Sequence, residues 1–336
     1  MRLDFIRPLY ERRGPYASVY LGALTGPERE THWHSVRDAL DGVDPATVAA
    51  LEEVAERAAA GQALFAAHGE VVLAEPLSRP PYERATWSPL PNVAPMLLER
   101  GENVPHLRVI VDHAGAELTV YGSGAPRKRT VAATTWPLQK TAQGGWSQRR
   151  YEVSVENAWE QNAQAVAHEI DEQVRRLGTE LIIVAGEPKS RSYLMHHLGT
   201  KATDRVVMVE HGSRSDHGQF EEDVEQALDD WLDRRRAELL ERHQESGGPV
   251  GLSQVARALR DGRVQALLLP GERPEPIWIG EGGAQLDTDR GELRHWGVAE
   301  PVRERADAAL VRATAMTDAE LWFTDGVKDV AAVLRY

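Results

Sequence analysis

The sequence contains no cysteine among its 336 residues. Disulfide bonds, thiolate zinc sites, iron–sulfur clusters and cysteine nucleophiles are therefore all excluded. Long apolar runs are also lacking, since no stretch approaches the roughly 18 consecutive apolar residues of a membrane-spanning helix. The opening residues MRLDF do not have the apolar stretch and small-residue cleavage site of a secretory signal. We therefore expect a cytoplasmic protein with no membrane segment.

Positive charge is scarce, with 39 Lys and Arg against 52 Asp and Glu and a formal net charge of −13. Contacts to nucleic-acid phosphates need Lys and Arg, so the overall balance is unfavourable for nucleic-acid binding. Net charge does not describe local charge, however. The distribution of the basic residues along the chain is therefore the more informative property.

Several motifs of known chemistry are absent. The sequence has no HExxH zinc motif, no GxxxxGK[ST] phosphate loop and no GxSxG nucleophile turn. The pairs His32/His34 and His196/His197 lack partners at metal-ligand spacing, which favours ordinary surface or core histidines. We predict no metal site and no cofactor.

The chain is long enough for two to three domains. In residues 1–104 we predict a strand over 17–21, a helix that begins at Asp44-Pro45, and a hairpin that turns at His68-Gly69. Six prolines follow between residues 76 and 95, which argues against any regular element there. This region is interpreted as an N-terminal α/β domain with an extended proline-rich connector.

Strand and helix patterns alternate in the rest of the chain. Residues 105–212 show a strand over 107–112, a return strand over 117–121, a helix that ends at Gly178, and further strands over 180–185 and 205–209. Residues 213–336 repeat this alternation. The predicted fold is α/β with three domains, over residues 1–104, 105–212 and 213–336.

One segment differs from the rest of the chain in charge. No acidic residue occurs between Glu117 and Glu152, and the segment carries six basic residues, Arg127, Lys128, Arg129, Lys140, Arg149 and Arg150. Gly144, Gly145 and Trp146 lie in the same segment. We predict an irregular basic loop over residues 126–150 that follows a phosphate backbone and stacks its indole on a base. A solvated hairpin tip is the alternative.

An acidic run between Glu221 and Asp233 is followed by Arg234, Arg235 and Arg236. Its order complements a helix dipole, and it reads as the solvated face of a long helix. A docking face for a basic partner is the alternative.

The basic segment also supports a resemblance. Residues 141–151, TAQGGWSQRRY, lead into a long helix and resemble the GGQ loop of archaeal and eukaryotic class I release factors. Residues 251–269, GLSQVARALRDGRVQALLL, and the ending GVKDVAAVLRY, residues 326–336, resemble the C-terminal domain of Pelota proteins. The three matches occur in the family's order. The chain resembles the bacterial branch of this superfamily, which includes the Balon-like ribosome hibernation factors.

The resemblance implies central and C-terminal α/β sandwich domains like the middle and C-terminal domains of release factors and Pelota. It implies binding in the ribosomal A site, with the basic loop at rRNA or the P-site tRNA near the peptidyl-transferase centre. The C-terminal domain would face a translational GTPase such as an elongation factor. The implied RNA-binding residues are Arg127, Lys128, Arg129, Lys140, Gly144, Gly145, Trp146, Gln148, Arg149 and Arg150.

Two departures from the family pattern decide the predicted activity. Trp146 occupies the position of the catalytic glutamine, and indole cannot position water as that glutamine does. Residues 1–104 contain neither NIKS nor YxCxxxF, the stop-codon elements. We therefore predict a non-catalytic ribosome-binding factor for hibernation or stalled-ribosome handling. Two alternatives stay open: a peptidyl-tRNA hydrolase that uses Gln148, and an acidic protein-interaction module.

Overall fold

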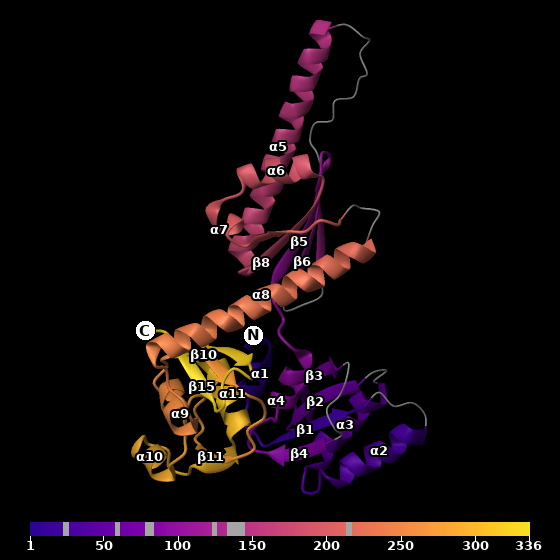
Figure 1. The fold of residues 1–336 in the computed structure, drawn as a ribbon. Helices are drawn as coiled ribbons and strands as arrows, with labels where there is room; N and C mark the ends of the chain where they lie inside the picture. Colours follow the sequence, from indigo (N-terminus) through magenta and orange to yellow (C-terminus); the bar gives the residue numbers. More distant parts are fainter. Residues whose placement is uncertain (23–26, 58–60, 78–83, 123–125, 133–144, 213–216) are drawn as a thin grey trace. The chain divides into compact units, whose positions relative to one another are not determined.

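The computed structural model describes residues 1–336 except 23–26, 58–60, 78–83, 123–125, 133–144 and 213–216 (Figure 1). The chain forms two compact units. One unit combines Met1–Glu102 with Arg236–Tyr336, and the other is Asn103–Arg235. Both units contain sheets covered by helices, so the predicted mixed α/β class is confirmed. The division into domains at 104/105 and 212/213 stays a prediction.

The N-terminal part of the first unit is an antiparallel sheet of order β3-β2-β1-β4. Its strands are β1 (Tyr16–Leu21), β2 (Gly61–Ala67), β3 (Glu70–Leu77) and β4 (Arg84–Ser88), preceded by the short helices η1 (Asp4–Ile6) and α1 (Pro8–Glu11). Helices α2 (Pro27–Asp38) and α3 (Pro45–Arg57) pack on one face. Helix α3 begins where predicted, because the Asp44 carboxylate accepts the Thr47 backbone N–H at 2.9 Å.

The β2–β3 hairpin is also confirmed. Its turn residues His68 and Gly69 both have positive φ, 53° and 81°, as a tight two-residue hairpin turn requires.

The expectation of no regular element among the six prolines is wrong. Pro76 lies in β3 and residues 84–88 form β4, which are the two edge strands of the sheet. Proline is tolerated on an edge strand because only one side of that strand takes part in the hydrogen-bond ladder. Pro95 lies in the first turn of α4 (Ala94–Arg100), where a missing N–H costs nothing.

The C-terminal part of the same unit has two three-stranded sheets, of order β14-β10-β15 and β12-β11-β13. Strand β10 (Val264–Leu269) pairs parallel with β14 (Glu320–Phe323) and antiparallel with β15 (Ala331–Leu334). The second sheet consists of β11 (Pro276–Ile279), β12 (Leu286–Asp287) and β13 (Val302–Arg305). The helices are α9 (Leu252–Arg260), α10 (Arg290–His295) and α11 (Ala306–Met316), and the last residues of α8 (His217–Ser246) belong here too.

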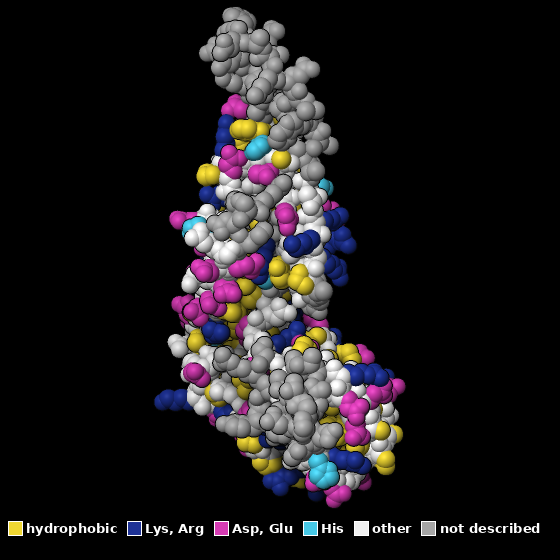
Figure 2. All heavy atoms as spheres, turned by 90° about the vertical axis from the view of Figure 1, so that its right-hand side faces the viewer, with side chains coloured by type: hydrophobic (Ala, Val, Ile, Leu, Met, Phe, Trp, Pro, Cys, Tyr) yellow, Lys and Arg dark blue, Asp and Glu magenta, His cyan; other side chains and the backbone are white. Residues whose placement is uncertain are grey.

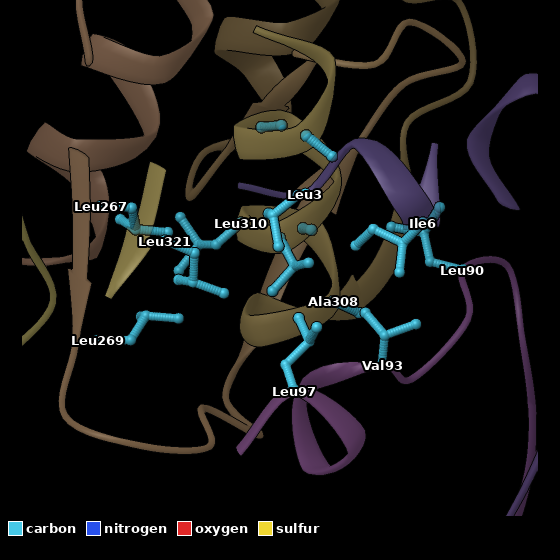
Figure 3. Close-up of a cluster of buried hydrophobic side chains, with 14 of the residues drawn as sticks. Leu3, Ile6, Leu90, Val93, Leu97, Leu267, Leu269, Ala308, Leu310 and Leu321 are labelled. Atoms are coloured by element: carbon cyan, nitrogen blue, oxygen red, sulfur yellow. The ribbon is translucent and has the colours of Figure 1, made fainter. Parts of the chain in front are cut away.

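These two parts share one hydrophobic core (Figure 3). Leu3, Ile6 and Leu97 from the start of the chain lie in the same cluster as Leu267 and Leu310, and all five are at most 3% exposed. Helix α4 packs on α11. The first hundred residues therefore bury apolar surface against the last hundred.

The second unit contains one five-stranded sheet of order β7-β6-β5-β8-β9. Its strands are β5 (His106–Asp112), β6 (Gly115–Tyr121), β7 (Arg127–Ala132), β8 (Leu181–Gly186) and β9 (Val206–Met208). Strands β5, β8 and β9 are parallel, and β6 is antiparallel to both of its neighbours. Helices α5 (Gly145–Leu177), α6 (Pro188–His197) and α7 (Thr200–Thr203) cover one face, and the start of α8 covers the other.

Candidate nucleic-acid interface

The predicted irregular loop over residues 126–150 is wrong at both of its described ends. Residues 127–132 form strand β7, which pairs with β6 from Val120↔Arg127 to Gly115↔Ala132. The strand was not predicted, because consecutive Arg and Lys residues are typical of a solvated loop. Basic side chains are in fact well suited to an edge strand, where they discourage pairing with a second sheet.

Helix α5 begins at Gly145, ten residues before the first apolar position of its predicted stripe. Gly145, Trp146, Gln148, Arg149 and Arg150 therefore belong to its first two turns. Their side chains lie outside the described part of the structure. Lys140 and Gly144 fall within residues 133–144, which are also outside it.

The three cations of β7 are all exposed, but they differ in their partners. Arg129 donates to Glu169 of α5 at 2.6 Å, and that carboxylate is only 16% exposed. Lys128 lies 3.6 Å from Glu117 of β6 and its side chain is 76% exposed. Among the described residues, no ion pair involves Arg127. Arg127 and Lys128 therefore present their charge to solvent, and Arg129 is held in a tight internal pair.

These partners change the local charge. The strand contributes +3 and the two carboxylates packed beside it −2, which leaves +1 over β7. Glu117 and Glu169 were missed by sequence reasoning because they are 11 and 40 residues away from the cations they meet. On the face shown in Figure 2, Lys and Arg side chains gather at the right edge of the middle of the view, and Asp and Glu side chains gather at the left.

The topology places the carboxyl end of β7 at the edge of the sheet beyond which α5 projects (Figure 1). Strand β7 is parallel to β5 and β8, because β6 is antiparallel to both β5 and β7. The carboxyl ends of β5, β7 and β8 therefore meet at one edge of the sheet. Helix α5 has 33 residues and a length of about 50 Å, whereas a six-residue strand spans about 20 Å. Its N-terminal part extends beyond this edge (Figure 1).

The described residues show no group of three or more His, Asp and Glu arranged to hold a metal ion. No helix in the described ranges is both long and apolar enough to cross a membrane.

Residues 105–249 match the model of the bacterial archaeo-eukaryotic release factor family 2. Over these residues the chain is similar to that family. The match covers the whole of the second unit from β5 onward and the remainder of α8, so the basic strand and the projecting helix both lie within the family region. The resemblance inferred from the sequence is confirmed for this region.

Curated relatives cover the whole chain. Uncharacterized proteins from two strains of Mycobacterium tuberculosis are 29% identical over 365 aligned positions, which cover 100% of this chain and 97% of each relative.

Three solved structures are similar at low identity. Ribosome-bound archaeal Pelota, described together with ABCE1, is 13% identical, covers 100% of this chain and 95% of its own, and has a TM-score of 0.39. The archaeal translation termination factor aRF1 is 13% identical over 99% of this chain and 96% of its own, with a TM-score of 0.24. Dom34 of S. cerevisiae, described as interacting with Hbs1, is 9% identical over 69% and 64%, with a TM-score of 0.32.

Proposed function

We propose that this protein is a non-catalytic ribosome-binding factor that occupies the A site of dormant or stalled ribosomes. The observation that supports it most directly is the cationic edge strand β7, which leads into a segment with Trp146 where release factors have glutamine. The family of residues 105–249 supports the ribosome as partner.

The basic residues have a defined part in this proposal. Arg127 and Lys128 meet rRNA or tRNA phosphates directly, because their side chains are exposed at the sheet edge. Lys140, Arg149 and Arg150 add charge along the projecting segment, and Gly144, Gly145 and Trp146 contact the acceptor end of the P-site tRNA. Arg129 contributes less, since its guanidinium is already held by Glu169. The C-terminal part of the chain faces a translational GTPase.

Ribosome pelleting over a salt series tests the proposal. If five cations neutralise phosphate, the log–log slope of affinity against salt is about −3.5 to −4.5. The ribosomes carry a P-site tRNA, and the A site is either empty or filled with aminoacyl-tRNA. We expect binding to the empty site and competition by A-site tRNA. Salt-indifferent binding, or equal binding to both ribosome forms, contradicts the proposal.

A peptide-release assay on the same ribosomes separates this proposal from the hydrolase alternative. We expect no release by the wild-type protein. Measurable release that Gln148→Ala abolishes would instead establish the enzyme. Trp146→Ala is expected to weaken binding.

The acidic-module alternative has its own variant. Charge reversal at Asp229 and Asp230, which are exposed on α8, should leave ribosome binding unchanged under our proposal. A larger loss from this reversal than from Arg127→Ala with Lys128→Ala would favour the alternative.

A further inference from the structure

Helix α5 leaves its domain at a definite turn. Ala158 is the first buried side chain along the described part of the helix, whereas Glu156 and Asn157 are exposed. From Gly145 to Glu156 the helix spans 12 residues, or about 18 Å. The turn around residues 156–162 is therefore the point from which the N-terminal part of α5 projects.

Side chains from α6 meet α5 at this turn. The Lys189 ammonium donates to Glu156 at 2.9 Å and lies 4.9 Å from the centre of the Trp159 ring. It also lies 5.9 Å from the ring centre of Tyr193, one turn further along α6. The half-buried indole of Trp159 is thus held by a cation that is itself fixed by a carboxylate on the same helix.

The turn between β5 and β6 meets α5 at the same place from another side. The His113 ring lies against Trp159, with 5.8 Å between ring centres, and its backbone carbonyl accepts from Asn162 Nδ2 at 3.2 Å. His113 Nδ1 is 3.5 Å from a Glu187 oxygen, at the junction of β8 and α6. Helix α6 and the β5–β6 turn therefore both contact α5 between Glu156 and Asn162.

The charges at this place argue against a second phosphate site. Glu156 and Glu187 oppose Lys189 and His113, so the cluster carries no excess positive charge. Its contacts are with α5 itself, and they lie where a change in helix direction has its largest effect. A tilt of 10° at this turn moves the start of α5 by about 3 Å, which is the length of a hydrogen bond.

We propose that Trp159, Lys189 and His113 form a clamp that fixes the direction of the projecting part of α5. This role rests on the proposed function: the clamp positions the basic segment at the start of α5 for its RNA contacts. Trp159 and Lys189 are positioning residues that touch no RNA. Their contribution is to hold the helix before binding, which lowers the ordering cost of association.

A distance measurement within the free protein tests the clamp without the ribosome. Because the chain has no cysteine, the pair Glu152→Cys and Lys201→Cys gives two unique spin-label positions, one on the projecting helix and one exposed on α7. We expect one narrow distance distribution in the wild-type background. Trp159→Ala should shift or broaden it by about 3 Å or more. An unchanged distribution in a folded Trp159→Ala protein would overturn the clamp.

Two further variants test the clamp if the Trp159→Ala protein does not fold. Lys189→Met removes the cation but leaves the half-exposed position filled, and it should broaden the distribution as well. Trp159→Phe keeps a ring for Lys189 and His113 and should restore a narrow distribution. Arg176→Met is the control, because it also removes a cation that pairs with a glutamate of α5, here Glu172, but at the opposite end of that helix.

Ribosome binding provides the second readout. Trp159→Ala should weaken binding but leave the salt slope unchanged, since the bound state keeps the same phosphate contacts. A reduced slope would mean that Trp159 or its neighbours contact RNA, which contradicts a purely positioning role. If the wild-type protein fails to bind ribosomes, the proposed function falls, and the distance measurement still decides the clamp.

Discussion

Replacing Leu97 with alanine tests whether the two ends of the chain fold as one body. Leu97 is fully buried on α4, in a cluster with Leu3, Ile6 and Leu310 (Figure 3). Truncating a buried leucine to alanine removes its transfer free energy and leaves a cavity, at a cost of about 3 kcal/mol. Because the cavity borders α11, the loss of stability should reach the C-terminal part of the chain.

The assay is urea unfolding combined with amide hydrogen exchange. We expect Leu97→Ala to reduce the protection of backbone amides in β1 and β2 and equally in β10 and α11. The substitution itself lies in none of these four elements. Leu98→Ala is the matched control, because the Leu98 side chain is next in sequence and is 38% exposed. That change should cost about 0.5 kcal/mol or less.

A core shared by the two ends of the chain is refuted if Leu97→Ala lowers protection only in residues 1–100. Residues 1–104 would then be an independent domain, and the shared core would contribute little to the free energy of unfolding. Equal losses from Leu97→Ala and Leu98→Ala would show instead that burial at this position does not determine stability.

Three further predictions concern the second unit. Gly186→Ala should destabilise it by about 3 kcal/mol or more, measured by chemical denaturation, because Gly186 has φ +120° and a β-carbon there would lie 1.9 Å from a backbone oxygen of β5. Burial lowers the pKa of His106, whose Nε2 accepts from Arg108 at 3.1 Å. As the pH falls, the unfolded chain therefore protonates His106 at a higher pH than the folded chain does. The free energy of unfolding should rise with pH up to about 6.5, and His106→Gln should reduce this dependence in thermal melts. In the pelleting assay, Arg127→Ala should make the salt slope shallower by about 0.7 to 0.9, and Arg129→Ala should change it less; equal changes would contradict the role given to the Arg129 ion pair.

Much of the fold follows from local patterns. The apolar stripe from Val155 to Leu177 predicted most of α5, and Gly178, with φ +60°, ends it as expected. The buried runs over 180–185 and 264–269 became β8 and β10. These elements are predictable because their signals, apolar periodicity and chain-ending glycines, act within a few residues.

The incorrect predictions concern segments whose structure depends on the elements that pack beside them. Pro76 and the residues of β7 are compatible with strands only because those strands lie at sheet edges. The first two turns of α5 have no apolar stripe, so their helical structure gave no periodic signal. Edge position is a property of the assembled sheet and is not present in any local window.

The sequence by itself determined elements such as α5, β8 and β10 and the similarity of residues 105–249 to the release factor family, because periodicity, turn residues and short motifs are local properties of the chain. Only the tertiary structure decided which charges remain available. Arg127 and Arg129 are equivalent in the sequence, yet one is unpaired among the described residues and the other donates to Glu169. It also decided that Leu3 and Leu97 share a core with Leu310. Such contacts join residues tens to hundreds of positions apart, and their energies depend on a geometry that exists only after the chain has folded.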